Sequence, residues 1–167
     1  DNLLLQLEFN HVRPYVYSHS EPITNYGHNN QSLGHQWGGN FQELVLLGYY
    51  HKDRFYSNAK FTLGTRGLDF DTADNKFNYG QNIYKDYDEN RPYDKDVKVG
   101  QGNKTSLFIT EIQVGYLVNP ATNLKFFGNF LYRNFDPTTN TATVFKEQTT
   151  WFTVGFRSDV FNWYLDY

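Results

Sequence analysis

Neither cysteine nor methionine occurs among the 167 residues of this chain. The absence of cysteine excludes disulfide bonds, zinc–thiolate sites and thiol nucleophiles together. The initiator methionine is missing, and the chain starts without the charged and then apolar segment of a secretory signal. We therefore expect a mature product or a fragment of a longer protein.

Long hydrophobic runs and an excess of basic residues are also lacking. The mean hydropathy is -0.69, and no stretch approaches the roughly 20 apolar residues of a membrane-spanning helix. This excludes a helical membrane protein but not a β-barrel, because barrel strands turn only half of their residues toward lipid. The net charge of -3 offers no basic footprint for nucleic acid, so we expect no nucleic-acid partner.

Alternation of apolar and polar residues is the strongest pattern that the chain does have. Between residues 3 and 10, apolar side chains occupy the odd positions, and positions 6, 8 and 10 are polar; the split recurs in 55–63, 111–118 and 124–133. A period of two is typical of β-strands, whose successive side chains point to opposite faces. The apolar positions are rich in aromatics, from a total of 15 Phe, 14 Tyr and 3 Trp. Such strands with a polar second face are what an outer-membrane barrel needs.

Six strands are predicted from this alternation, and a last alternating piece, Phe161–Tyr167, is either a seventh strand or a continuation of the sixth. The six are Leu3–Tyr17, Asn40–His51, Arg54–Arg66, Ser106–Asn119, Leu124–Asn134 and Gln148–Ser158.

The predicted connections alternate in length. Residues 51–54 and 119–123 are tight turns, whereas 18–39, 67–105 and 136–147 are long polar loops. Bacterial outer-membrane barrels combine short periplasmic turns with long external loops, and a soluble β-sandwich would have more even connections. We therefore predict an all-β fold, an antiparallel transmembrane β-barrel in contact with the lipid of a bacterial outer membrane.

Six or seven strands are too few for a single-chain barrel, where eight is the practical minimum. One alternative is a small, self-contained eight-stranded structural barrel with further strands inside the long loops. Another is a soluble β-sandwich binding domain. We favour a third arrangement, in which residues 1–167 form the C-terminal segment of a larger barrel.

The stretch from Arg13 to Glu43 is the richest in chemistry-bearing residues. Its three histidines are separated by nine and seven residues, which does not specify a zinc site, and we expect neither a metal nor a cofactor. Aromatic faces for stacking on sugars, together with side chains that read hydroxyl groups, would suit glycan binding; the alternative is a hydrogen-bonded polar loop packed in a barrel mouth. The predicted ligand-binding residues are Arg13, Tyr15, His19, His28, His35, Trp37, Asn40 and Glu43.

The same stretch carries a family resemblance. Its Arg-Pro-Tyr-x-Tyr-Ser-His, Asn-Tyr-x-His-x-Asn-x-x-Leu-x-His and Gly-x-Asn-x-x-Glu-Leu elements resemble the C-terminal third of the capsule-assembly Wzi family, and more narrowly its RemB-type branch from gliding bacteria. The ending from Val154 to Tyr167 is similar to the close of that branch. The resemblance implies an outer-membrane barrel with many more strands, associated with surface polysaccharide or with adhesin and gliding-motility machinery.

Three shorter motifs also occur in the long loops and next to them. Asp86-x-Asp88-x-Asn90 begins like a calcium loop, but Arg91 and Val97 replace the glycine and the bidentate glutamate that an EF-hand requires. Asp71–Thr72–Ala73 resembles an O-glycosylation acceptor, which makes Thr72 a glycosylation candidate. Asn103–Lys104–Thr105 fits the N-linked pattern.

Catalytic motifs are absent from the sequence. It contains no Gly-x-Ser-x-Gly, His-Glu-x-x-His or phosphate-binding loop. Glu8, Glu43 and Glu111 could supply a carboxylate pair, but nothing in the sequence fixes the separation that glycoside hydrolysis demands. We therefore predict no catalytic residues and a protein that is not an enzyme.

Overall fold

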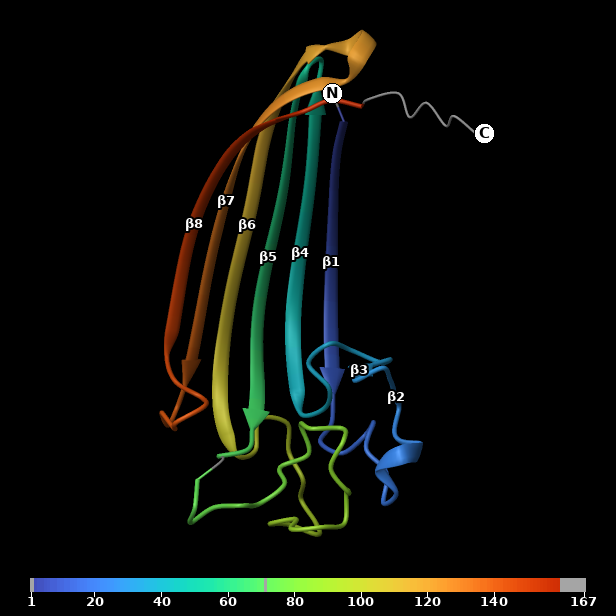
Figure 1. Cartoon of the computed structure of the whole chain (residues 1–167), viewed down its shortest axis with the longest axis vertical. Coiled ribbons are helices and arrows are strands. Elements are labelled where there is room, and N and C mark those ends of the chain that lie inside the picture. The colour runs from blue at the N-terminus through green and yellow to red at the C-terminus, as the bar shows by residue number, and fades with distance from the viewer. Residues whose placement is uncertain (1, 71, 160–167) are drawn as a thin grey trace, which may run out of the picture.

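A single antiparallel sheet of six long strands makes up most of the computed structural model, which describes residues 2–70 and 72–159. Each long strand pairs with the long strand before it in the chain, in the order β1-β4-β5-β6-β7-β8 (Figure 1). Their bounds are β1 Asn2–Val12, β4 Phe41–Lys52, β5 Phe55–Leu68, β6 Asn103–Asn119, β7 Leu124–Pro137 and β8 Glu147–Arg157.

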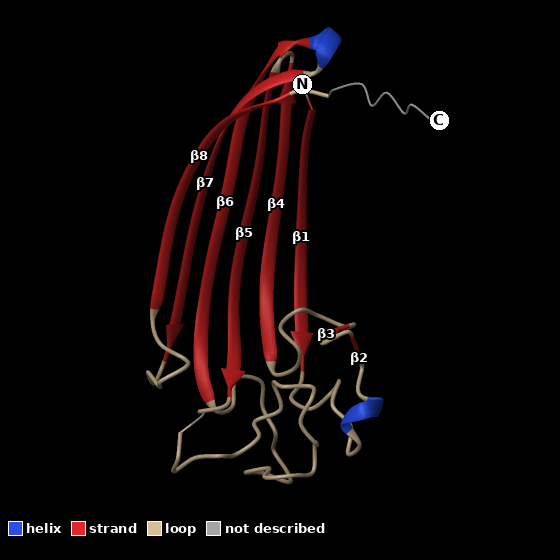
Figure 2. Ribbon diagram, viewed as in Figure 1, coloured by secondary structure: helices blue, strands red, loops and turns tan. Residues whose placement is uncertain are grey.

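The remaining elements are short and lie in the connections. A two-residue hairpin, β2 (Gly27–His28) with β3 (Gln31–Ser32), sits between β1 and β4. The 3-10 helices η1 (Pro22–Thr24) and η2 (Pro120–Thr122) are one turn each (Figure 2). Within the described residues, no helix has the length and apolar character needed to cross a bilayer.

The predicted strands are confirmed with one correction. The first strand ends at Val12 rather than at Tyr17, because Pro14 cannot donate to a sheet ladder and Tyr15 adopts a left-handed conformation with φ of 66°. The other five strands begin and end within about three residues of the prediction. The predicted piece Phe161–Tyr167 lies outside the described residues.

Short and long connections alternate between the two ends of the sheet, as predicted. Asp53 and Asn123, with φ of 53° and 49°, make the tight β4–β5 and β6–β7 turns at one end. The three long connections, residues 13–40, 69–102 and 138–146, gather at the other end (Figures 1 and 2). In the described part of the chain, β1 and β8 are the two edges of the sheet.

One face of the sheet, here called the apolar face, is mostly hydrophobic along the middle of the strands and carries many exposed apolar side chains. Register places Leu5, Gly48, Ala59, Ile112, Phe130 and Phe152 in one row across the six strands, with further rows on either side. At the two edges, Leu7 is 67% exposed and Phe152 is 74% exposed. Rings from neighbouring strands meet on this face, as Phe130 and Phe152 do with centroids 4.9 Å apart. Exposed apolar surface on this scale marks a face that is covered by something other than water.

The opposite face, here called the polar face, carries the charges from the middle of the strands. On the apolar face of the described strands, charged side chains occur only at strand ends. They belong to Lys52, Lys104 and Asp136. The polar face holds Glu8, Glu43, Lys60, Arg66, Glu111, Lys125, Arg133, Glu147 and Arg157. One ion pair crosses between strands there, from Arg133 to Glu147 at 3.6 Å.

The buried core lies where the polar face meets the long loops. Trp37 from the β1–β4 connection packs with Phe41 of β4 and Leu107 of β6, and Val12, Ile109 and Phe135 surround them. The core thus joins the loops to one end of the sheet, and residues 2–70 and 72–159 leave both faces of the rest of the sheet uncovered.

Candidate functional site

Two long connections, residues 13–40 and 69–102, join into one structure at the end of the sheet, here called the loop layer. The backbone N–H of Tyr15 donates to the carbonyl of Gly80 at 3.0 Å, and that of Gly39 donates to the carbonyl of Gln81 at 3.0 Å. The Ser18 hydroxyl reaches the carbonyl of Asn82. Because these bonds satisfy backbone groups that would otherwise need water, the two loops stabilise each other.

Asn40 is the most connected residue of the loop layer. Its side chain is fully buried, and its φ of 56° lies in the left-handed region that asparagine tolerates. The Nδ2 group lies 2.8 Å from the carbonyl of Gly67, 3.1 Å from that of Tyr79 and 2.9 Å from that of Gln101. The Oδ1 atom accepts from the N–H of Gly100 at 2.7 Å. Asn40 was predicted to bind a ligand, but its burial makes it a clamp between β5 and the loops.

Tyr15 anchors the first loop on the second. Its hydroxyl donates to the carbonyl of Asn78 at 2.6 Å and accepts from Nε2 of Gln101 at 3.3 Å. The guanidinium of Arg91 lies over its ring, 4.7 Å from the centroid. Burial raises the pKa of the Tyr15 hydroxyl, against the opposing effect of Arg91. One face of this ring is therefore taken and is not open for stacking on a sugar.

Glu43, His35 and Trp37 form a second cluster at the junction of loop and sheet. The backbone N–H of Trp37 donates to Nδ1 of His35 at 3.1 Å, so Nδ1 is the accepting nitrogen of this imidazole. The other nitrogen, Nε2, then carries the proton and donates to Oε1 of Glu43 at 2.9 Å. The same Oε1 accepts from Nδ2 of Asn10 at 2.9 Å. Glu43 is 6% exposed and Trp37 is 7% exposed, so this cluster holds the loop rather than presenting a surface.

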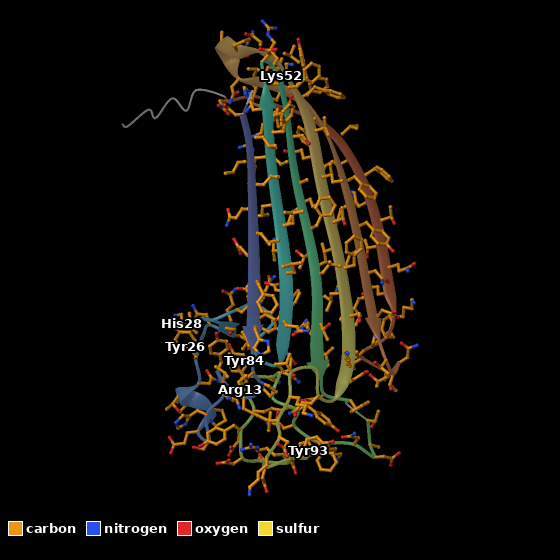
Figure 3. All side chains as sticks on the ribbon, turned by 180° about the vertical axis from the view of Figure 1, so that it is seen from behind. Arg13, Tyr26, His28, Lys52, Tyr84 and Tyr93 are labelled. Carbon is orange, nitrogen blue, oxygen red and sulfur yellow. The ribbon has the colours of Figure 1, made fainter. Side chains whose placement is uncertain are left out.

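The remaining predicted site residues lie apart from both clusters. Arg13 and His28 are exposed at the loop end of the molecule, while Lys52 marks the turn end (Figure 3). His19 accepts from the N–H of Glu21 at its Nδ1 and packs edge-on against Tyr87. In the described residues the acidic and histidine side chains do not gather into a metal-binding group. Ligand binding at Arg13, His19 and His28 stays a prediction.

An open cleft of about 760 Å³ lies between the loop layer and the polar face. Its charged and amide lining comes from Arg66 at the end of β5 and from Asp69, Lys76, Gln81, Asn82 and Lys85 of the second loop. Phe135 of β7 supplies an aromatic wall. We call this hollow the Arg66 cleft.

Arg66 is the least satisfied cation of the cleft. Its Nη2 donates to the carbonyl of Trp37 at 3.2 Å, and its guanidinium lies 5.3 Å from the centre of the Trp37 ring. Its Nε is buried without a hydrogen-bond partner, and no carboxylate of the described residues pairs with it. Lys85, in contrast, is paired with Asp69. A half-buried guanidinium with unused donors can bind an anionic group.

The sequence did not point to Arg66, Gln81 or Lys85. Only the position of Arg66 carried a signal, since it continues the polar positions of β5 into the loop end of the strand. Gln81 and Lys85 reach the cleft through contacts between segments that are distant in the chain, and no local sequence pattern predicts this.

The modification motifs have different surroundings. Thr72 is exposed, with its backbone bridged to Asn75, while Asp71 lies outside the described residues. Thr72 therefore stays a glycosylation candidate. The N-linked interpretation of Asn103 is wrong for the folded chain, because Asn103 is 1% exposed and its Nδ2 donates to the carbonyl of Thr139 at 2.7 Å.

Comparison of the chain with protein-family models, with curated proteins and with solved structures finds no match in any of the three.

Proposed function

We propose that this chain is a wall segment of an outer-membrane β-barrel, with the apolar face against lipid and the polar face toward the lumen. The observation that carries the proposal is the distribution of charge on the sheet. Lys60, Glu111 and Arg133 lie on one face, whereas the apolar face of the described strands has charged residues only at strand ends. Lipid-facing strands require this separation, since a charge near the bilayer centre costs about 2–4 kcal/mol.

The height of the apolar band fits a membrane. On β5 it runs from Phe55 to Leu63, and on β6 from Phe108 to Tyr116. Eight residue steps at about 3.4 Å give about 27 Å along the strand, and a tilt of about 40° lowers this to roughly 21 Å. An outer-membrane barrel has an apolar band of about 25 Å flanked by aromatic girdles. Tyr50, Phe55 and Tyr116 would form the girdle at the turn end.

The barrel we propose is larger than six strands. The edge strands β1 and β8 are eleven residues long each, and alternate residues turn their backbone pairing groups to the outer side, where no described strand lies. Exposed edges of this length favour pairing with further strands, and closure is how barrels remove them. We propose that the rest of the same protein supplies these strands, in agreement with the resemblance to Wzi-type barrels.

The role we propose is non-enzymatic: the loop layer meets surface polysaccharide outside the cell, or adhesin and motility proteins. The folded loops and the Arg66 cleft support this role. Amide side chains such as Gln81 and Asn82 beside the aromatic wall of Phe135 are suited to hydroxyl-rich ligands.

Single-cysteine variants provide the test, because these 167 residues contain no cysteine and any cysteine in the rest of the natural protein can be replaced by serine beforehand. A spin label is placed in turn on Leu5, Gln6, Leu7 and Glu8 of the natural protein, reconstituted in lipid vesicles. We expect collisions with oxygen at Leu5 and Leu7, and collisions with a water-soluble nickel complex at Gln6 and Glu8. The same alternation should occur at Phe61 against Lys60.

A different outcome would contradict the proposal. If the protein remains monodisperse in buffer without detergent and the labels at Leu5 and Leu7 are immobilised in a core, the sheet belongs to a soluble sandwich. Deletion of the protein from its host, followed by assays of capsule retention, adhesion and gliding, tests the surface role separately.

A further inference from the structure

We propose that the Arg66 cleft binds a carboxylate-bearing saccharide, with the sugar carboxylate on the Arg66 guanidinium. This inference rests on the proposed function, and it names the chemical class of glycan that the loop layer would bind.

Charge is the first argument. The described residues that line the cleft include three cations, Arg66, Lys76 and Lys85, but only one carboxylate, Asp69. Asp69 already pairs with Lys85, and its Oδ1 also accepts from the N–H of Tyr79 at 2.8 Å. The cleft therefore has a net positive charge that the described chain does not neutralise, and its natural counterpart is an anion.

Geometry favours a carboxylate over a diffuse anion. The Trp37 ring and the Trp37 carbonyl hold the guanidinium of Arg66 in place from one side. A fixed, planar guanidinium matches the two oxygens of a carboxylate in a paired hydrogen-bond geometry, which a flexible lysine does not offer. Such charge-assisted pairs are about twice as strong as neutral hydrogen bonds.

The rest of the lining fits a sugar rather than a small ion. A volume of about 760 Å³ exceeds what a single anion needs and lies in the range of ligand pockets, about 300–1,000 Å³. The Nδ2 of Asn82 has no hydrogen-bond partner among the described residues, while its Oδ1 accepts from the N–H of Tyr84. The N–H donors of the Asn82 amide are thus available for hydroxyl groups, and Phe135 offers an apolar wall for a sugar ring.

Calorimetric titration of the natural protein in detergent with trigalacturonic acid tests the inference. Maltotriose serves as the neutral sugar and inorganic phosphate as the anion without a sugar. We expect binding of trigalacturonic acid that weakens with salt, and at least tenfold weaker binding of maltotriose and of phosphate. R66Q should lower the affinity at least tenfold, and R66K should lower it about threefold or more, because lysine keeps the charge but loses the paired geometry.

K95Q is the matched control, since it removes one positive charge from an exposed position of the same connection that does not line the cleft. Its affinity should stay within twofold of the native value. Because R66Q could also loosen the loop layer, K76Q supplies a second variant at an exposed position of the lining, with an expected loss of about twofold to fivefold.

Each outcome has a defined meaning. Equal affinity in the native protein, R66Q and K76Q, or no binding of trigalacturonic acid at all, overturns the inference. Equal binding of phosphate and trigalacturonic acid overturns the saccharide part of it. The spin-label experiment reports on the membrane proposal independently, so a barrel without sugar binding defeats only the inference, and sugar binding without a barrel defeats only the membrane proposal.

Discussion

The guanidinium of Arg66 lies over the indole ring of Trp37, 5.3 Å from its centroid, and donates to the Trp37 carbonyl. Through this contact a sheet residue holds a loop residue that is 29 positions away in the chain. Phe41 packs against the same indole in a T-shaped arrangement, with ring centroids 5.4 Å apart. The indole is therefore the joint between the sheet and the loop layer, and changes around it should affect both.

Gly64 leaves room for this joint. A Cβ atom at this position would lie 2.6 Å from Cη2 of Trp37, closer than atoms approach without a shift. We expect Gly64→Ala to displace the indole and lower the free energy of unfolding by about 1–3 kcal/mol, as overpacking of a core does. Gly128→Ala is the control, because its Cβ would meet nothing closer than 4.0 Å. Urea unfolding of both variants gives the comparison, and equal midpoints would show that the indole adjusts freely.

Asn40 should be the most sensitive position of the loop layer. In Asn40→Asp, a carboxylate oxygen takes the place of the Nδ2 donor. The carbonyls of Gly67, Tyr79 and Gln101 then lose their hydrogen-bond donor. Because several buried backbone groups lose their partner, we expect a loss of about 3 kcal/mol or more. Hydrogen exchange should show the second loop opening while the strands stay protected.

Asn30→Asp is the matched control for this substitution. Asn30 has a similar backbone conformation, with φ of 59°, but it is exposed. The loss of stability there should be small, because aspartate tolerates the left-handed backbone as asparagine does. Similar losses at both positions would mean that the side-chain contacts of Asn40 contribute little.

The strands could be predicted from the sequence because the pattern that defines them is local. Whether Leu5 or Gln6 faces the apolar side depends only on the period of two along β1, and register carries the same division across all six strands. The end of β1 depends instead on distant residues. Tyr15 takes its left-handed conformation where its N–H meets Gly80 and its hydroxyl meets Asn78, which are more than 60 positions away.

The site was only partly predictable for the same reason. The composition of residues 13–43 predicted a functional site there, and residues 13–40 form one of the two connections of the loop layer. The other half comes from residues 69–102, in which aromatic residues are scattered among turn-forming and charged residues without a regular period. Asn40 looks like any loop asparagine until its partners, 27 to 61 positions away, are known.

Tyr15 makes the loop layer sensitive to alkaline pH. Burial raises the pKa of its hydroxyl above the value of about 10 that it has in the unfolded chain. A group with a raised pKa contributes stability that is fully present below pH 10 and is lost as the pH rises through the folded value. Tyr15→Phe should therefore be less stable than the native protein at pH 8, because the carbonyl of Asn78 loses its donor, and the difference should shrink above pH 10. Urea unfolding between pH 8 and 12 measures this, with the exposed Tyr93→Phe as the control; a constant difference would contradict the role of Tyr15.

The apolar face offers the most direct energetic test of the proposed membrane location. Ala59 lies at mid-strand on this face, next to Gly48 and Ile112 on the neighbouring strands. At the bilayer midplane, an arginine on the lipid face costs about 2–4 kcal/mol, so Ala59→Arg should lower stability in lipid vesicles by that amount. Phe55→Arg, on the same strand at the turn end, should cost only about 0–1 kcal/mol in charge transfer, because the interface is polar. Gln113→Arg places the same side chain on the polar face of β6 and should be close to neutral. Equal costs at Ala59 and Gln113 would mean that the two faces meet the same surroundings, which no barrel wall in a membrane allows.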